Sequence, residues 1–202
     1  MHVPNALRER RAVKQYDPAH VMPEEDIRRL LELTLEAPSA FNIQNARFVV
    51  VRDPELRIKL RAAAWDQAQV TDASIIVILC ADLKSWAKSP ERYWRNAPEA
   101  VQKQLLPMIK KYYEGHEQVQ RDEAMRSCGL AGMALMLAAQ DLGYQSCPMD
   151  GFDFAAFAKL IDLPHDHVIS FIVAVGKGTK PAWPHPGQLP YEEVVKQDRF
   201  PA

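Results

Sequence analysis

Four cations crowd the beginning of the chain. Arg8, Arg10, Arg11 and Lys14 fall within seven positions, ahead of the first segment with a clear helical pattern. Guanidinium groups form forked hydrogen bonds to a phosphate, and a lysine ammonium beside them adds a point charge. Charge spacing alone is more often typical of a solvated basic surface. The segment therefore leaves two interpretations open, an anion site and an ordinary basic face.

A second polar group lies in the segment 37–51, APSAFNIQNARFVVV, between a helical pattern and a strand pattern. Pro38, Ser39, Asn42 and Gln44 place several hydrogen-bonding groups at this connecting turn, and such turns often hold ligands. The same residue types are common turn formers for purely local reasons. Turn chemistry alone does not separate these two interpretations.

Runs of apolar, β-branched residues predict the strands that position these segments. The segments 48–51, 74–81 and 168–175 are short, continuous and apolar, which is typical of strands covered on both faces, and together they make the core of a sheet. A proline followed by three acidic residues begins a predicted amphipathic helix over 23–37. A second helix is expected over 54–64, directly after the first strand.

The segment 84–143 shows no strand pattern and is expected to be helical throughout. Its charged first part, about 84–126, is interpreted as a peripheral excursion. The part 129–143 is apolar almost all round, so we expect a central helix of the domain or a helix at a subunit interface. Prolines and glycines then indicate an ordered C-terminal arm over about 176–202, which we expect to pack on a partner subunit. No linker divides the chain, so a single domain over 1–202 is expected.

Charge and composition exclude several function classes. The 202 residues carry 25 Lys plus Arg against 26 Asp plus Glu, so no long-range field favours nucleic acid or an anionic membrane, and a small-molecule partner is expected. The longest uncharged stretch, 127–140, is too short to span a membrane, and 1–9 lacks the apolar core of a signal peptide. We therefore expect a cytoplasmic protein. Cys80, Cys128 and Cys147 are too widely spaced for a disulfide framework or a paired-thiolate metal site.

The two polar segments form part of a longer pattern. Arg-Arg-x-Val-Lys-x-Tyr at 10–16, followed by Ala-Pro-Ser-x-x-Asn-x-Gln at 37–44, resembles the FMN-dependent nitroreductase family. The segments 64–82, 129–153 and 175–195 resemble that family's second strand, its central helix with the flavin-contacting loop, and its C-terminal phosphate loop. The resemblance spans nearly the whole chain in the same order.

The resemblance implies a fold, an assembly and a reaction. The fold is α+β, a three-layer α-β-α sandwich whose central mixed or antiparallel sheet is flanked by helices, in an intertwined homodimer. The reaction moves a hydride from NADPH or NADH through bound FMN to a small aromatic acceptor, such as a nitro compound or a quinone, by a ping-pong mechanism. The excursion would lie over the flavin. Two interpretations of its aromatics stay open, ordinary packing and a substrate-facing role for at least one of Trp86, Trp94, Tyr112 and Tyr113.

The resemblance also assigns cofactor contacts. Arg10 and Arg11 would hold the FMN phosphate and ribityl chain, and Lys14 would approach the pyrimidine edge, where a cation stabilises the reduced flavin. The turn at 38–42 would reach FMN from the opposite subunit, and the backbone at 150–151 would face its reactive nitrogen. No catalytic side chain is required. The expected cofactor-binding residues are Arg10, Arg11, Ala12, Lys14, Pro38, Ser39, Ala40, Asn42, Asp66, Gln69, Pro148, Met149, Asp150, Gly151, Lys177 and Gln188.

Several positions depart from the family pattern. Ala40 replaces a serine that many relatives have, Asp66 stands where many have asparagine, and Gln69 stands where lysine is often found. In the final loop an arginine commonly binds the phosphate, and here Gln188 or Lys177 is left for that role. These departures affect the affinity for FMN and the reduction potential of the bound flavin more than the identity of the cofactor.

Other interpretations are weighed beside this one. The segment 165–167, His-Asp-His, has metal-ligating types but no further ligand in view, so no metal is expected. Prolines after the Gly-Lys-Gly at 176–178 forbid the helix that a nucleotide phosphate loop needs. A related flavin enzyme, such as a dehalogenase, a flavin-fragmenting enzyme or an enoate reductase, and a non-catalytic flavin-binding protein are the alternative functions. No basic pocket for a 2′-phosphate stands out, so NADH and NADPH are both retained.

Overall fold

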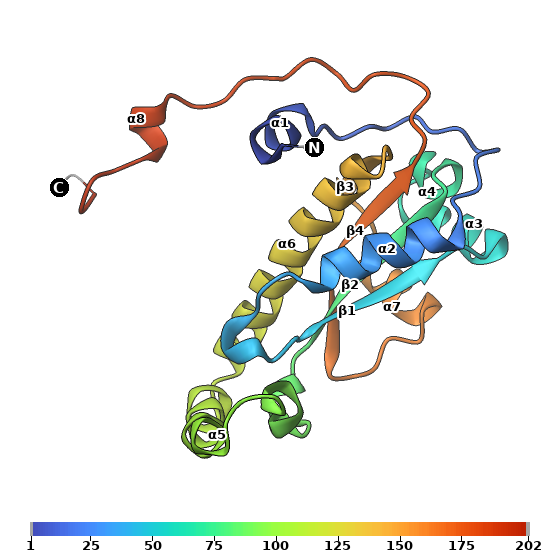
Figure 1. Cartoon of the computed structure of the whole chain (residues 1–202). Coiled ribbons are helices and arrows are strands. Elements are labelled where there is room, and N and C mark those ends of the chain that lie inside the picture. The colour runs from blue at the N-terminus through green and yellow to red at the C-terminus, as the bar shows by residue number, and fades with distance from the viewer. Residues whose placement is uncertain (1, 201–202) are drawn as a thin grey trace.

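A four-stranded sheet forms the centre of the computed structural model, which describes residues 2–200. Its strands are β1 (Ala46–Val51), β2 (Ile75–Asp82), β3 (Gln145–Met149) and β4 (His167–Gly176), in the spatial order β1-β2-β4-β3. Each neighbouring pair is antiparallel (Figure 1). The sheet is therefore wholly antiparallel in the part of the chain that the structure describes.

Three strands coincide with the predicted apolar runs. β1, β2 and β4 begin and end within two residues of 48–51, 74–81 and 168–175, so these predictions are confirmed. β2 is buried along its whole length because it lies between β1 and β4. β1 is an edge strand in which only Val51 is fully buried, so the expected cover on both faces does not hold for β1 within one chain.

The strand β3 was not predicted from the sequence. It is short and contains Pro148, whose nitrogen cannot donate to a strand ladder. A proline is tolerated here because β3 lies at the edge of the sheet and pairs only with β4 among the named strands. The segment expected as a flavin-contacting loop therefore begins as an edge strand, and the loop itself follows at Asp150.

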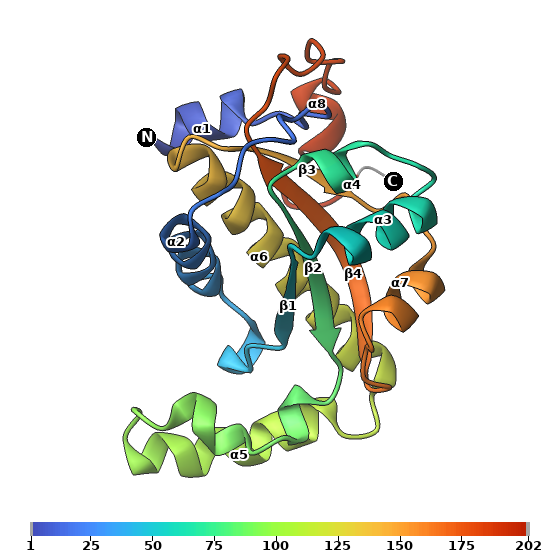
Figure 2. The same cartoon turned by 90° about the vertical axis from the view of Figure 1, so that its right-hand side faces the viewer.

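Helices cover both faces of the sheet and confirm the three-layer α+β arrangement (Figure 2). One face carries α2 (Glu24–Leu35) and α6 (Glu117–Asp141); the other carries α3 (Pro54–Ala63), α4 (Gln69–Asp72) and α7 (Phe154–Leu160). The helices predicted over 23–37 and 54–64 are thus confirmed as α2 and α3. α4 and α7 are additional helices.

Alternation along β2 divides the core into two clusters. Ile75 and Val77 pack with α2 and α6, whereas Ile76 and Ile78 pack with α3 and α7. Successive strand side chains point to opposite faces, so a continuous apolar run is what a strand with helices on both sides requires. Each such side chain contributes about 1.5–3 kcal/mol by burial. The core of the sheet is therefore a rigid support for the loops at its ends.

The helix α6 runs unbroken for 25 residues, across the division expected between the excursion and the central helix. On its sheet side, a Cβ at Gly132 would lie only 2.2 Å from Phe171 Cζ, so glycine permits the close approach. On its other side, Leu130 is 50% exposed, in line with the half-buried Met133 and Leu137. The apolar character all round the helix thus reflects the sheet on one side and an uncovered apolar stripe on the other.

The excursion projects from the end of the sheet where β2 finishes (Figure 2). It consists of η2 (Ser85–Ala87), η3 (Pro90–Trp94) and α5 (Glu99–Tyr113), and it has its own small core around Ile109 and Tyr113. The expectation of helix throughout is wrong for 85–98, where two 3-10 turns replace an α-helix. Prolines at 90 and 98 limit the backbone hydrogen bonding there.

α1 (Val3–Glu9) and the start of the C-terminal arm lie at the opposite end of the sheet (Figure 1). α1 lies beside the arm, which leaves β4, passes α1 and carries α8 (Tyr191–Val194) away from the sheet (Figure 1). Within residues 2–200, no helix has the length and apolar character that crossing a membrane requires.

Candidate functional site

The basic segment is held against the edge of β3 by backbone contacts. Ala12 forms a parallel bridge with Ser146, and the backbone nitrogen of Val13 donates to the Ser146 carbonyl at 3.1 Å. Further along, Tyr16 forms an antiparallel bridge with Gly178. Val13 and Tyr16 are buried, whereas Lys14 between them is exposed. These buried side chains and backbone contacts hold the segment against the sheet and leave the Lys14 side chain exposed.

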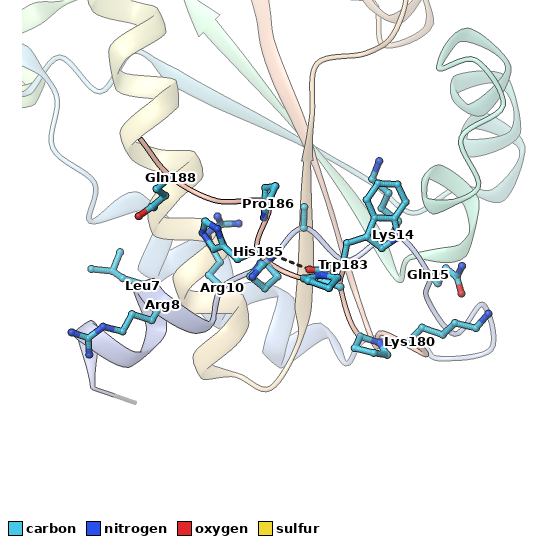
Figure 3. Close-up of a pocket in the computed structure, with 15 residues that line it drawn as sticks. Leu7, Arg8, Arg10, Lys14, Gln15, Lys180, Trp183, His185, Pro186 and Gln188 are labelled. Atoms are coloured by element: carbon cyan, nitrogen blue, oxygen red, sulfur yellow. Dashed lines mark hydrogen bonds between the residues drawn. The ribbon is translucent and has the colours of Figure 1, made fainter. Parts of the chain in front are cut away.

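A cavity of about 960 Å³ lies between α1, the basic segment and the arm (Figure 3). It collects five predicted cofactor contacts, Arg10, Arg11, Ala12, Lys14 and Gln188. Arg8, Lys180 and His185 also line it, although the sequence did not assign them to cofactor binding. An arginine, a lysine and a histidine from separate segments converge only once the arm folds back beside α1.

The charge of this cavity is uncompensated. Among residues 2–200, no carboxylate lies within ion-pair distance of Arg8, Arg10, Lys14 or Lys180. Burial raises the pKa of the Cys147 thiol on β3, while the charges of Lys14 and Arg10 act in the opposite direction. Clustered cations without partners favour a bound anion such as a phosphate. The anion-site interpretation of the basic segment is therefore the one the geometry supports.

The arm covers part of this cavity. The Arg11 guanidinium donates to the Trp183 carbonyl at 2.7 Å, and the Lys14 ammonium lies 5.5 Å from the centre of the Trp183 ring (Figure 3). Such a cation over an aromatic face is attracted by the ring quadrupole. These contacts fix the arm where its polar residues face the basic segment.

Lys177 lies elsewhere. Its ammonium donates to the Gly143 carbonyl at 2.7 Å and lies 4.4 Å from the centre of the Tyr144 ring, just beyond the C-terminal end of α6. A cation there is stabilised by the free carbonyls and the dipole of the helix. The structure therefore does not bring Lys177 into the cavity.

A second part of the predicted site lies on the loop before α4 and at the first residue of that helix. Gln69 is buried and donates to Gln67 at 3.1 Å, and Gln67 in turn donates to the Gly151 carbonyl at 2.8 Å. A Cβ at Gly151 would lie 2.9 Å from Trp65 Cζ3, so only glycine permits this approach without displacement of the indole. These contacts bring Gln69 beside the predicted backbone contact at Gly151.

The other predicted residues of this part have distinct surroundings. Asp66 has a left-handed backbone with φ of 58° and forms an ion pair with Arg61 at 2.7 Å. Met149 is buried and Pro148 half-buried in β3, which leaves Asp150 as the first residue of the exposed loop. Trp65, which is 71% exposed, was not predicted from the sequence as a site residue. The sequence feature that could have indicated Trp65 is an aromatic residue directly before the polar residues Asp66 and Gln67.

The turn that holds Pro38 and Ser39 lines a separate pocket of about 220 Å³. The Ser39 hydroxyl accepts a hydrogen bond from the Gln44 backbone nitrogen at 2.9 Å, and Asn42 donates to the Tyr93 carbonyl at 2.9 Å. The short helix η1 (Ala40–Asn42) completes the turn. Figure 1 places it near α5, at the end of the molecule opposite α1 and the arm. Within one chain the two halves of the predicted site are therefore apart.

A charged cluster connects the excursion to the sheet. The Lys88 ammonium lies 2.8 Å from Asp82 and 2.7 Å from Asp166, and His167 contacts Asp166 at 2.6 Å. The hydrogen bond from Lys88 lowers the pKa of Asp166 to about 2. Asp82, Asp166 and His167 have the residue types of a metal site, and Asp82 is the third group that the sequence did not place there. An ammonium between the carboxylates already supplies the positive charge, so we interpret the cluster as structural.

The four aromatic residues of the excursion divide into packed and exposed groups. Trp86 stacks with the buried Tyr113 at a centroid separation of 6.2 Å, and the Trp94 indole donates to the Phe41 carbonyl at 2.9 Å. Tyr112 is 42% exposed, and the neighbouring Glu123 carboxylate raises the pKa of its hydroxyl. Tyr112 is therefore the aromatic with the most surface available for a ligand.

Comparison with known proteins agrees with this geometry. The model described as "Nitroreductase family" matches residues 7–177. The chain is similar to protein DrgA of Synechocystis sp., with 47% identity over 196 residues that cover 95% of this chain and 93% of the relative. It is similar to YodC of Bacillus subtilis, assigned by name to the NAD(P)H nitroreductases, with 33% identity over 195 residues covering 94% and 96%.

Two further similarities bear on ligands. A crystal structure of an Exiguobacterium sibiricum protein in complex with FMN matches with a TM-score of 0.91 and 25% identity, covering 98% of this chain and 97% of that one. The enzyme named CLA biosynthesis enone reductase, from Lactiplantibacillus plantarum, is 28% identical over 183 residues, covering 85% of this chain and 83% of the relative.

Proposed function

Because the chain belongs to the nitroreductase family, we propose that it is an oxidoreductase that uses FMN to pass electrons from NADPH or NADH to nitroaromatic or quinone acceptors. The observation that carries this proposal is the convergence of unpaired cations on one cavity beside β3. Bound FMN supplies the redox chemistry, and the protein supplies placement and electrostatics. A cytoplasmic location stays a prediction from the sequence.

The phosphate and ribityl chain of FMN fit the end of the cavity lined by Arg10 and Arg11. Gln188, Lys180 and His185 face the same space and take the place of the arginine that relatives use in this loop. Two guanidiniums and a lysine leave ample positive charge for a phosphate dianion. The departure at Gln188 therefore changes which groups bind the phosphate more than whether it is bound.

Lys14 is held in position by the bridges that flank it in the sequence. Residues 12 and 16 are fixed to Ser146 and Gly178, so the backbone at Lys14 stays at the edge of β3. We assign its ammonium to the pyrimidine edge of the flavin, where reduction increases negative charge and a fixed cation is stabilising. Because the backbone is anchored before any ligand binds, little reorganisation is needed.

The loop that follows β3 completes the flavin site. The Gly151 backbone faces the flavin's reactive nitrogen in our proposal, and the hydrogen bond from Gln67 holds its carbonyl in place. Trp65 lies beside Gly151 and offers an exposed ring at the same place. Close backbone approach of this kind requires a residue without a Cβ. Asp66 and Gln69 act in this arrangement by shaping the loop.

The proposed active unit is a homodimer. The uncovered stripe of α6 at Leu130, Met133 and Leu137 and the arm beyond Trp183 are apolar surfaces without a partner in one chain. The pocket at Pro38 also includes Ser127 and Ala131 of α6, so it opens beside that stripe. Dimerisation along α6 would cover the stripe and bring each Pro38 turn to the partner's flavin, which joins the two separated halves of the site.

Both substrates use the same open space in turn, which gives a ping-pong mechanism. No side-chain nucleophile or acid-base pair is required, since electrons enter and leave through the cofactor. The test is a steady-state study that varies donor and acceptor together. Parallel double-reciprocal lines with a nitroaromatic or a quinone support the proposal, and intersecting lines or a lack of turnover with both acceptors contradict it.

A second candidate function is reduction of an activated carbon–carbon double bond. It is favoured by the similarity to the enone reductase, which covers 85% of this chain. The same donor assay with a panel of α,β-unsaturated ketones separates the two. A kcat/KM for an enone above that for every nitroaromatic and quinone would replace the first candidate with the second.

A further inference from the structure

A second large cavity, of about 730 Å³, lies between the turn before β1 and the 3-10 helix η3. Its wall is mainly polar. It is lined by Asn42, Gln44, Arg47, Arg92, Tyr93, Trp94, Arg95, Asn96 and Ala97. Nothing in the flavin site described above uses the arginines of this cavity.

Two of its three arginines lack a counter-ion. Arg47 is paired with the buried Asp82 at 3.1 Å, so its charge is already balanced. Arg92 and Arg95 are exposed, and in the described part of the chain no carboxylate lies within ion-pair distance of either. A concave site with two unbalanced guanidiniums attracts an anion, and the forked geometry of guanidinium suits phosphate.

The cavity wall is organised by contacts within the chain. The Arg92 guanidinium lies 4.7 Å from the centre of the Tyr93 ring and donates to its hydroxyl at 2.6 Å. The Tyr93 carbonyl accepts from Asn42, and the Trp94 indole donates to the Phe41 carbonyl. These bonds fasten η3 to the turn. The orientation of at least one guanidinium is thus set before a ligand arrives, which lowers the entropic cost of binding.

The position of the cavity points to the ligand. Gln44 and Arg47 line both this cavity and the pocket that contains Pro38 and Ser39. In the proposed dimer the Pro38 turn contacts the partner's flavin, so the arginine cavity is the neighbouring space. A nicotinamide that stacks on that flavin carries an adenosine end, and in NADPH this end bears an additional phosphate. Arginine beside the adenosine ribose is a common means of accommodating a 2′-phosphate.

We propose that Arg92 and Arg95 bind the 2′-phosphate of NADPH and make NADPH the preferred electron donor. This inference rests on the proposed function in placing the flavin beside the Pro38 turn. The phosphate site itself consists only of groups from one chain and can bind without turnover.

The test uses the FMN-loaded protein, the double variant R92Q/R95Q and a matched control, Arg121→Gln. Glutamine keeps hydrogen-bonding capacity and removes the charge. Arg121 is an exposed arginine of α6 that lines none of these cavities. Calorimetric titration compares 2′,5′-ADP with 5′-AMP, which lacks the 2′-phosphate. The wild type and R121Q are expected to bind 2′,5′-ADP at least about tenfold more tightly, and the double variant is expected to lose this difference.

Kinetics supply the second readout. In R92Q/R95Q the KM for NADPH is expected to rise by about tenfold while the KM for NADH changes by less than about twofold. FMN content and the thermal midpoint should match the wild type, because both side chains are exposed. Equal affinity of the wild type for the two nucleotides, or an unchanged preference in the double variant, overturns the inference.

Two other outcomes are distinguishable. If the double variant changes only the KM for 4-nitrobenzoate relative to nitrobenzene, the cavity binds an anionic acceptor and the assignment to the donor is wrong. If 2′,5′-ADP binds selectively through these arginines but neither NADPH nor NADH reduces the protein, the proposed function fails while the phosphate site stands.

Discussion

Replacement of Asp82 by asparagine tests how the excursion is held on the sheet. The Asp82 carboxylate is 2% exposed and lies 2.8 Å from Lys88 and 3.1 Å from Arg47. Loss of one partner from a fully buried ion pair costs about 3–5 kcal/mol. Arg47 and Lys88 are 36% and 40% exposed, so water screens the charges left behind. We therefore expect D82N to lower the free energy of unfolding by about 2 kcal/mol.

The assay is urea denaturation at neutral pH, with Glu32→Gln as the control. Glu32 forms an ion pair with Arg28 in which both side chains are more than half exposed, so its loss should cost about 0.5 kcal/mol or less. The acceptor KM of D82N should also rise, because the excursion borders the proposed acceptor site. Equal stability of D82N and E32Q would show that the cluster does not anchor the excursion.

The Asp82 carboxylate should also make the free energy of unfolding depend on pH. Burial opposes ionisation of Asp82, but hydrogen bonds from Lys88 and the Lys84 backbone nitrogen hold its pKa below the ordinary value. A lowered folded-state pKa gives stability that is complete above the unfolded pKa of about 4 and is lost as the pH falls through the folded pKa. D82N should therefore flatten the acid limb of a stability profile below about pH 4. If D82N and the wild type lose stability equally below about pH 4, the lowered pKa of Asp82 does not contribute to acid unfolding.

Three further changes test the fold, the assembly and the flavin site. Gly132→Ala places a Cβ 2.2 Å from Phe171 Cζ and should cost about 1–3 kcal/mol by overpacking; an unchanged urea midpoint would refute the close approach. Leu130→Glu puts a charge on the uncovered stripe and should shift light scattering from dimer to monomer, with Ile58→Glu on α3 as the control that stays dimeric. Lys14→Gln should retain FMN but slow its anaerobic reduction by about tenfold or more; an unchanged rate would remove Lys14 from that role.

Local patterns were sufficient to predict the core of the fold. The apolar run predicted at 74–81 coincides with β2, where burial on both faces requires a continuous apolar pattern, and the proline with three acids before Ile27 begins α2 as expected. In contrast, β3 depends on pairing with β4 across intervening helix α7, and its Pro148 argues locally against a strand. Such long-range pairing outweighs local propensity and cannot be deduced from a short window.

The site was predictable where a single segment carries it. Arg10, Arg11 and Lys14 lie together because they are neighbours in the sequence, and the structure adds the anchoring that aims them. Lys177 does not line the cavity within one chain because its ammonium donates to the Gly143 carbonyl, a contact across 34 residues that no local pattern indicates. The arginine cavity was missed for the same reason, since it forms only when the Tyr93 carbonyl accepts from Asn42, 51 residues earlier.

In the proposed function, the cations around Lys14 hold a flavin that exchanges electrons with a nicotinamide donor. This is tested by the visible spectrum of the purified, FMN-supplemented protein, recorded before and after anaerobic addition of NADPH or NADH. We expect a bound flavin spectrum that bleaches with donor and returns when a nitroaromatic or quinone is added. A bound flavin that neither donor bleaches would indicate a non-catalytic flavin-binding protein, and a protein that retains no FMN would show that these cations do not hold a flavin.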